Sequence, residues 1–216
     1  MKNTIDKYTV LSKFHEILSP QLYLEIGVRA GNSLKLAKGK AVGVDLNPII
    51  RKFLSNDSRI YRMTSDEFFK KDRLDGETPD LVFIDGEHLF EYVLRDFRNV
   101  ERIASSDTKV ILDDVFPFLH EQGTRIKNTV IWTGDVWKII PILKKYRPDL
   151  DLIPLDVQAT GLLLVSNLDS KNQTLWEKYD EIVEEWKDQS IPDYILHREG
   201  SFKHIDVLLK NLVVCG

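Results

Sequence analysis

The sequence predicts an α/β protein built on a doubly wound, mostly parallel sheet of seven strands. An antiparallel strand pair ends the sheet, and extra helices follow it. Three observations predict this fold: short apolar runs alternate with amphipathic stretches, a glycine-bearing turn follows the first run, and acidic residues stand where several runs end. Alternation of strand and helix favours right-handed crossovers between parallel strands.

Five short apolar runs are the expected parallel strands. They cover residues 22–26, 41–44, 59–63, 81–84 and 110–112. Several are rich in Val and Ile, and they are apolar on nearly every position, which suits central strands that helices cover on both faces.

The segments between these runs are expected to be helices. Residues 31–38 and 48–55 give short ones, and Pro48 fits a first helical turn because its missing N–H costs nothing there. Thr64-Ser65-Asp66-Glu67 can cap a third helix. Apolar residues at helical spacing predict a fourth helix, with one buried face, over residues 89–103.

The rhythm changes after residue 113. A long connection over 116–132 precedes a helix at 135–146, which is expected despite Pro141. Strands at about 151–157 and 161–165 lie close enough in sequence to form an antiparallel pair. A helix is expected over 174–188, and 205–214 is a last helix or strand. No linker divides the chain, so we expect one domain: an N-terminal helix in 1–20, a core over 21–166 and a helical addition over 167–216.

Composition excludes several classes of protein. The chain has 216 residues, 43% of them hydrophobic, and 30 basic against 34 acidic side chains give a net charge of −4. A slightly acidic chain is a poor candidate for gripping nucleic acid through phosphate neutralisation. Cys215 is the single cysteine, and no apolar run approaches the roughly 20 residues that span a bilayer. We expect a soluble, cytoplasmic protein that binds neither nucleic acid nor membrane.

The turn after the first run is the most informative stretch. An apolar strand leads into Glu25, then Gly27 and Gly31 stand four residues apart, with Ser33 following. Glycine allows a sharp turn with positive φ and close approach of a ligand to the main chain. The next strand ends at Asp45, where a carboxylate can accept hydrogen bonds from both hydroxyls of a ribose.

Two nucleotide cofactors fit this frame, and the turn favours one of them. A dinucleotide needs room for pyrophosphate, which the G-x-G-x-x-G pattern supplies, but Val28 and Arg29 follow Gly27 here. Glu25 would repel pyrophosphate, whereas it can orient the ammonium group of S-adenosylmethionine, directly or through water. The methyl donor is therefore favoured over a nicotinamide cofactor; an ordinary strand-to-helix turn is the plain alternative.

These motifs together resemble a known family. Glu25-x-Gly27-x3-Gly31-x-Ser33 with Val42-Gly43-Val44-Asp45 is similar to class I S-adenosylmethionine-dependent methyltransferases of the catechol O-methyltransferase-like branch. Four downstream stretches resemble a subgroup of this branch that includes macrolide-sugar and aminocoumarin O-methyltransferases. They are Phe83-Ile84-Asp85-Gly86-Glu87-His88, Ile111-Leu112-Asp113-Asp114, Thr133-Gly134-Asp135-Val136-Trp137-Lys138 and Thr160-Gly161-Leu162. The similarity covers about residues 20–166 and implies a Rossmann-like fold. Ser105-Ser106-Asp107 departs from it, because the family commonly carries Pro-Gly-Gly there.

Three carboxylates follow neighbouring expected strands: Asp85 after one, and Asp113 with Asp114 after another. Ligands bind beyond the carboxyl ends of strands in an open α/β sheet. Three converging anions would raise one another's pKa unless a cation neutralised them, and Mg²⁺ or a similar divalent ion is suited to this. Adjacent strand residues point to opposite faces, so both Asp113 and Asp114 reach an ion only if the strand curls, as the resemblance implies. Surface acids that cap helices are the alternative.

The proposed chemistry needs a base for the acceptor hydroxyl. His88 lies three residues past Asp85 and its usual pKa range suits the task, while Asp85 is the other candidate. Ser65 and Asp66 follow the third strand, where relatives contact the adenine; a helix N-cap is the competing role, above all for Ser65.

The sequence thus predicts a metal-assisted O-methyltransferase that acts on a hydroxyl of a small molecule or sugar. A metal-independent methyltransferase with His88 as base, or a nucleotide-binding module without turnover, is the alternative. The aromatic, acidic helix over 174–188 would cover the sheet or form a subunit contact, which leaves a homo-oligomer as a further expectation.

Overall fold

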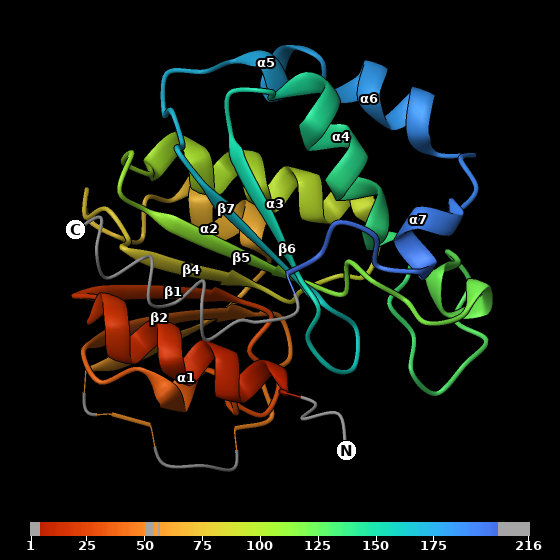
Figure 1. Ribbon diagram of the computed structural model, residues 1–216. Helices are drawn as coiled ribbons and strands as arrows, with labels where there is room; N and C mark the ends of the chain where they lie inside the picture. Colours follow the sequence, from red (N-terminus) through yellow and green to blue (C-terminus); the bar gives the residue numbers. More distant parts are fainter. Residues whose placement is uncertain (1–4, 51–53, 56, 203–216) are drawn as a thin grey trace.

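A single seven-stranded sheet organises the computed structural model, which describes residues 5–50, 54–55 and 57–202. The strand order is β3-β2-β1-β4-β5-β7-β6 (Figure 1). The strands are β1 (Leu22–Ile26), β2 (Lys40–Asp45), β3 (Ser58–Arg62), β4 (Leu81–Ile84), β5 (Lys109–Asp113), β6 (Asp151–Leu155) and β7 (Leu162–Ser166). The first five pair in parallel, and β7 runs antiparallel to both β5 and β6. The predicted fold class, with its terminal antiparallel pair, is confirmed.

Helices cover both faces of this sheet (Figure 1). They are α1 (Lys7–Leu18), α2 (Ser65–Lys70), α3 (Phe90–Ile103), α4 (Ile139–Tyr146), α5 (Thr174–Glu177), α6 (Tyr179–Trp186) and α7 (Asp193–Leu196), with 3-10 turns η1 (Leu34–Leu36), η2 (His120–Gly123) and η3 (Val136–Lys138). Helix α1 lies on one face, whereas α2, α3 and α4 lie on the other. Among the described residues, no helix is long and apolar enough to cross a membrane.

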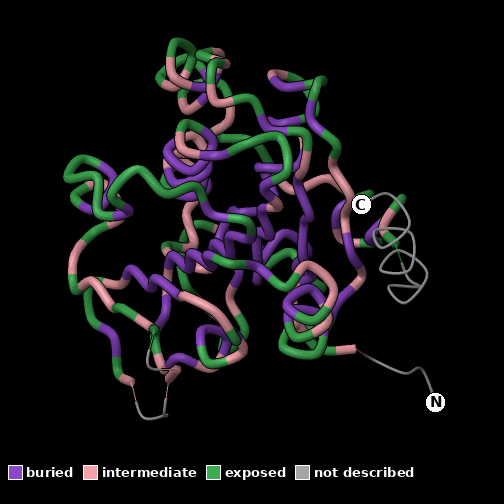
Figure 2. The backbone as a smooth tube through the Cα atoms, turned by 90° about the vertical axis from the view of Figure 1, so that its left-hand side faces the viewer, coloured by how far each residue is buried: buried purple, intermediate pink, exposed green. Residues whose placement is uncertain are grey.

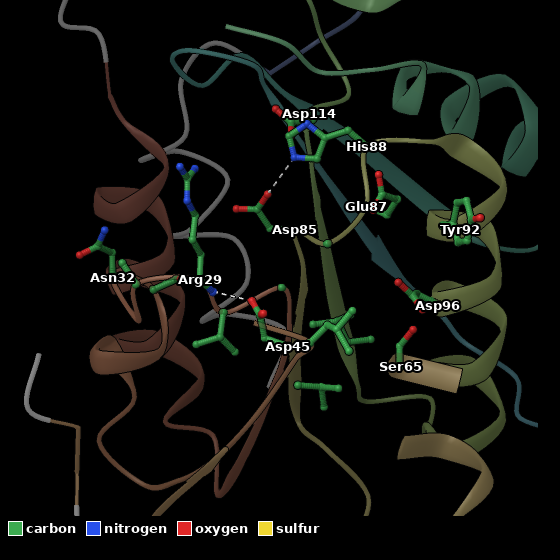
Figure 3. A pocket seen from close by; sticks show the side chains of 18 of the residues that line it. Arg29, Asn32, Asp45, Ser65, Asp85, Glu87, His88, Tyr92, Asp96 and Asp114 are labelled. Atoms are coloured by element: carbon green, nitrogen blue, oxygen red, sulfur yellow. Dashed lines mark hydrogen bonds and ion pairs between the residues drawn. The ribbon is translucent and has the colours of Figure 1, made fainter. Parts of the chain in front are cut away.

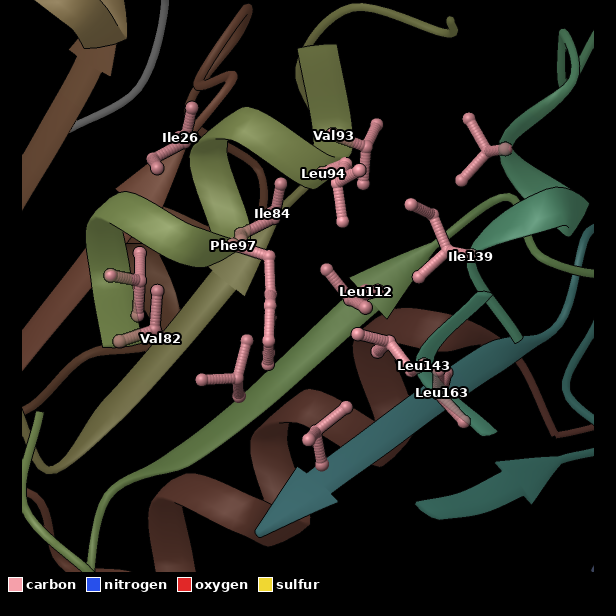
Figure 4. Packing of buried hydrophobic residues seen from close by; sticks show 14 of the residues in the cluster. Ile26, Val82, Ile84, Val93, Leu94, Phe97, Leu112, Ile139, Leu143 and Leu163 are labelled. Carbon is pink, nitrogen blue, oxygen red and sulfur yellow. The ribbon is translucent and has the colours of Figure 1, made fainter. Parts of the chain in front are cut away.

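The pleat of the strands divides the buried side chains into two clusters, one on each face. Leu24 and Ile26 of β1 face α3 and α4, whereas Tyr23 faces α1. Figure 4 shows Phe97 of α3 packed over the strand residues Val82, Ile84 and Leu112 on the first of these faces. The buried stretches run through the centre of the molecule in Figure 2. Successive residues of a strand point to alternate faces of the sheet, and the side chains just beyond each strand continue this alternation.

Several expected helices are shorter than the sequence predicts. Residues 31–38 contain only the 3-10 turn η1, because Gly31 takes a left-handed φ of 72° and Ala37 is already extended before β2 begins at Lys40. The expected 48–55 helix is not formed over residues 48–50, and residues 51–53 lie outside the described ones, as does the element expected over 205–214. Helix 174–188 divides into α5 and α6, and α7 was not predicted.

The first turns of α2 and α4 explain two local predictions. Thr64 caps α2: its side chain accepts from the Glu67 N–H, and the Glu67 carboxylate accepts from the Thr64 N–H, which completes a capping box. Pro141 is tolerated because it stands in the first turn of α4, where no intrahelical hydrogen bond is required of its nitrogen.

Arg198 fastens the loop between β6 and β7 to the rest of the molecule. It is 5% exposed and its guanidinium donates to the Asp156 carboxylate at 2.6 Å. It also donates to three backbone carbonyls, those of Val157 (3.0 Å), Ala159 (2.7 Å) and Phe116 (3.1 Å). These bonds hold residues 157–160, part of which lines the cavity described below, against the end of β5.

Replacing this guanidinium should destabilise the protein. We expect Arg198→Met to lower the free energy of unfolding by about 3 kcal/mol, because the partly buried Asp156 carboxylate and three carbonyls lose their donor. Urea denaturation monitored by circular dichroism measures it. Lys40→Met, which removes an exposed ion pair with Glu77, serves as the control and should cost less than about 1 kcal/mol. Equal losses in the two variants would show that Arg198 is not a structural fastener.

Candidate active site

A cavity of about 1030 Å³ opens at the carboxyl edge of the parallel strands. One side is lined by the turn after β1 and by the ends of β2 and β3; the other is lined by Asp85, His88 and Asp114 (Figure 3). Its volume is large enough for a small-molecule ligand of the size of a nucleoside cofactor.

Gly27 is required where β1 meets this cavity. Its φ is 89°, and a Cβ added there would lie 1.9 Å from the carbonyl oxygen of Asp85. Its N–H donates to the carbonyl of Val44 at 2.9 Å. The turn therefore lies directly between the ends of β2 and β4, and any side chain at this position would force β4 away. Gly31 also has positive φ, and its added Cβ would lie 3.3 Å from Ile50.

Asp45 braces the same turn from the end of β2. One carboxylate oxygen accepts from the Arg29 N–H and the other from the Asn47 N–H, both at 2.7 Å (Figure 3). Each oxygen keeps a further lone pair, and Asp45 lines the cavity. Asp45, for which the sequence predicts a ribose contact, therefore lies at the cavity wall with its carboxylate oriented by two backbone N–H groups.

Glu25 is placed differently from the predicted ammonium contact. It is fully buried on the face that α1 covers, and it is not among the residues that line the cavity. Its carboxylate accepts from the Tyr23 hydroxyl at 2.8 Å and from Ser33 at 2.7 Å. Ser33 itself lines the cavity, so it connects the ligand space to Glu25. Burial raises the pKa of Glu25 to about 8, although both hydroxyls oppose the shift.

Ser65 and Asp66 both line the cavity, but they have different neighbours. Thr64 is the N-cap of α2, so the hydroxyl of Ser65 is free of the capping role that competed with ligand binding. It hydrogen-bonds to Asp96 of α3. Asp66 instead forms an ion pair with Arg95 at 3.0 Å, and its side chain is 45% exposed.

The three predicted metal carboxylates separate into two directions. Asp85 and Asp113 follow neighbouring strands in register and share the face that α1 covers. Asp114 has a φ of 63°, which turns the chain out of β5 and directs its carboxylate toward His88. One ligand atom from each of Asp85, His88 and Asp114 lies within 4.8 Å of the others. Asp113 is not part of this group, because adjacent residues at a strand end still diverge despite the curl.

Lys7 supplies a cation that the sequence analysis missed. Its ammonium group, in the first turn of α1, donates to Asp85 at 2.7 Å and also to Asp113. Although burial works against its charged form, Asp113 and Asp85 raise the pKa of Lys7 above its usual value. Asp6 as an N-cap signal could have placed Lys7 in a first helical turn, but no motif indicates which part of the sheet that turn faces.

His88 is held with one nitrogen toward the carboxylates. Its Nδ1 lies 2.8 Å from the carbonyl oxygen of Trp132, which can only accept, so Nδ1 carries a hydrogen. Its Nε2 lies 3.1 Å from Asp114 and 3.9 Å from Asp85. The imidazole also stacks on Trp132, with 5.2 Å between the ring centroids. A proton or a cation must therefore separate Nε2 from the Asp114 carboxylate.

The electrostatics of the cluster follow from burial. Burial, and after it repulsion from Asp113, raises the pKa of Asp85 and of Asp114 well above the usual range of an aspartate. Lys7 opposes the shift at both sites. The site thus holds more carboxylates than Lys7 alone can neutralise, and it can take up a proton or another cation.

The glycine turn, Asp45 and the cluster of Asp85, His88 and Asp114 lie at one edge of an open α/β sheet. Residues 24–115 match the family model of a methyltransferase domain, which confirms the resemblance predicted from the sequence. The matched residues include the glycine turn, Asp45 and the cluster Asp85, His88 and Asp114.

Solved structures share this fold at low sequence identity. The methyltransferase PaMTH1 of Podospora anserina, bound to S-adenosylhomocysteine, is 14% identical, with a TM-score of 0.60 over 76% of this chain and 78% of that one. The O-methyltransferase TomG of Streptomyces achromogenes, in complex with S-adenosylmethionine, is 16% identical, with a TM-score of 0.57 over 76% and 80%. An O-methyltransferase of Bacillus cereus is 13% identical, with a TM-score of 0.54 over 74% and 80%. No curated protein sequence matches the chain.

The raised pKa of Glu25 should make stability depend on pH. Between the usual carboxyl value of 4.5 and about 8, Glu25 is protonated in the folded state and ionised in the unfolded state, so stability falls as pH rises through this window. Glu25→Gln removes this dependence. As the pH rises from 5 to 8, we expect the free energy of unfolding of the variant, measured by urea denaturation, to increase by about 2 kcal/mol relative to that of the wild type. Parallel curves would show that Glu25 does not titrate in this range.

Proposed function

We propose that the protein is an S-adenosylmethionine-dependent O-methyltransferase whose acceptor is a hydroxyl on a small molecule or sugar, assisted by a divalent cation. One observation carries the proposal: the turn at Gly27 and Asp45 and the cluster of Asp85, His88 and Asp114 face the same cavity. A donor held by the first would present its methyl group within the space bounded by the second.

The residues at the turn fit the methyl donor. Gly27 lines the cavity with backbone alone, because a side chain there would collide with the Asp85 carbonyl, and Asp45 can accept from ribose hydroxyls. The two glycines lack the spacing that pyrophosphate requires, which separates the site from a dinucleotide site. Bound there, the donor supplies an electrophilic methyl group on a sulfonium.

The second half of the cavity fits the acceptor. Trp132, Ile131 and Tyr8 line it beside polar groups, so an acceptor with an apolar face and a hydroxyl is accommodated. Holding the hydroxyl oxygen in line with the methyl–sulfur bond provides most of the rate enhancement. The new carbon–oxygen bond forms as the carbon–sulfur bond breaks, the sulfonium becomes a thioether, and the hydroxyl proton passes to a base.

His88 is the base that we propose for the reaction without a metal ion, because a nitrogen that binds an ion cannot also take a proton. Its Nδ1 is fixed by the Trp132 carbonyl, so its Nε2 is the nitrogen that can take a proton from an acceptor in the cavity. Asp85 is the other candidate, but its carboxylate is engaged by Lys7.

The donor set also fits a divalent ion. Asp85, His88 and Asp114 present two carboxylates and one imidazole within 4.8 Å, a combination that suits Mn²⁺ or Fe²⁺ as well as Mg²⁺. Such an ion would lower the pKa of an acceptor hydroxyl bound to it, so that the hydroxyl proton would pass to water rather than to His88. Asp113 would join the ligands only after release from Lys7.

Lys7 favours a second candidate, a methyltransferase that needs no metal. Its ammonium already lies against two of the three predicted metal carboxylates. In that case Lys7 supplies the positive charge and His88 alone supplies the base.

Turnover in the presence of a chelator separates the two candidates. We expect formation of S-adenosylhomocysteine from S-adenosylmethionine with a panel of catechols and free sugars, measured by mass spectrometry. If the ion is required, EDTA should reduce the rate at least about tenfold and Mn²⁺ or Mg²⁺ should restore it. An unchanged rate with EDTA would establish the metal-independent reaction. Donor binding without product from any acceptor would indicate a nucleotide-binding module.

Removal of Lys7 should strengthen metal binding. Lys7→Met frees the Asp85 and Asp113 carboxylates, so we expect the Kd for Mn²⁺ alone, measured by calorimetry, to fall about tenfold. Lys38→Met removes the same charge from an exposed position and serves as the control. An unchanged Kd in Lys7→Met would show that Lys7 and the metal do not compete.

A further inference from the structure

Asp96 is a buried carboxylate that neither the sequence motifs nor the proposed chemistry uses. It is 4% exposed and lies on α3 between Val93 and Val100, at the spacing of the buried stripe of that helix. A charged side chain at such a position costs free energy unless a partner satisfies it. Burial raises the pKa of Asp96 to about 7, so the protein itself supplies little compensation.

The Asp96 side chain lines the cavity rather than packing into the core (Figure 3). Ser65 hydrogen-bonds to it, which leaves most of the acceptor positions of the carboxylate unfilled among the described residues. A Cβ added to Gly86 would lie in van der Waals contact with an Asp96 oxygen, at 3.7 Å, so the carboxylate lies directly beside the backbone of Gly86.

This carboxylate lies where the base of the donor should be. Asp45 orients the ribose at the end of β2, and beyond β3 the cavity continues past Met63 and Ser65 to Asp96. Adenine presents one exocyclic amino group, which is a hydrogen-bond donor. A buried carboxylate can accept a hydrogen bond from this amino group. A purine with a carbonyl in place of the amino group would instead present an acceptor to the carboxylate, which is also an acceptor.

The residue predicted for this contact is turned elsewhere. Asp66 pairs with Arg95 at 3.0 Å, and its side chain is about half exposed. We infer that Asp96, together with Ser65, reads the 6-amino group of the adenine and so makes the site selective for adenosine over other purine nucleosides. The inference rests on the proposed function, because it needs the donor in this cavity.

Binding of S-adenosylhomocysteine and of analogues with a modified purine base tests the inference without changing the protein. The wild type should bind S-adenosylhomocysteine about 10–100-fold more tightly than the analogues that carry 6-oxopurine or 6-unsubstituted purine, measured by calorimetry. If the wild type binds all three equally, no residue reads the amino group and the inference is wrong. If it binds none of them, the proposed function fails and the inference fails with it.

Asp96→Asn then assigns the selectivity to this residue. An amide can donate to the 6-oxo group, so the preference for adenine over 6-oxopurine should fall at least about tenfold. Glu91→Gln, which removes a carboxylate from the same helix outside the cavity, is the matched control and should keep the preference. Thermal melts check that each variant folds. The measurements of the wild type with the analogues do not depend on the folding of any variant. A preference that disappears in Asp66→Asn and persists in Asp96→Asn would overturn the assignment.

Discussion

The close approach between the turn at Gly27 and the end of β4 is the constraint on which the site depends. Strand β1 lies between β2 and β4, and the turn that leaves it lies against the Asp85 carbonyl with no room for a side chain. This contact places the glycine turn and the carboxylate cluster on the walls of one cavity. A parallel sheet brings strand ends together at one edge, and the missing side chain lets the turn pack this close to the end of β4.

Charge balance at that edge is the second determinant. Asp85 and Asp113 share the face that α1 covers, and the Lys7 ammonium lies against both; Asp114 points to the opposite side, toward His88. The sequence argument that clustered carboxylates require a cation is therefore met, but by a side chain of the protein itself. A metal bound by Asp85, His88 and Asp114 would have to coexist with that side chain or displace it.

Much of the fold could be predicted because apolar runs and glycine turns are local signals. The strands over 22–26 and 81–84 were predicted with the bounds that the structure has, and the Thr64 cap was recognised from four residues. The prediction of a helix over 31–38 was wrong, because the length of this segment's helix depends on where β2 begins. Lys7 could not be predicted, since its role depends on how α1 packs across the sheet. Asp96 carries a weak signal, a charged residue on a buried helical stripe, which the motifs do not include.

The position of Lys7 in the first turn of α1 links the active site to the N-terminal helix. The rest of that helix is anchored by Val10, Leu11 and Phe14 in the apolar layer beneath the sheet, so its start has limited freedom to withdraw. A cation bound by Asp85, His88 and Asp114 would compete with this helix for the Asp85 carboxylate. Occupancy of the pocket and the docking of the helix start are therefore thermodynamically coupled, and a perturbation at either end is felt at the other.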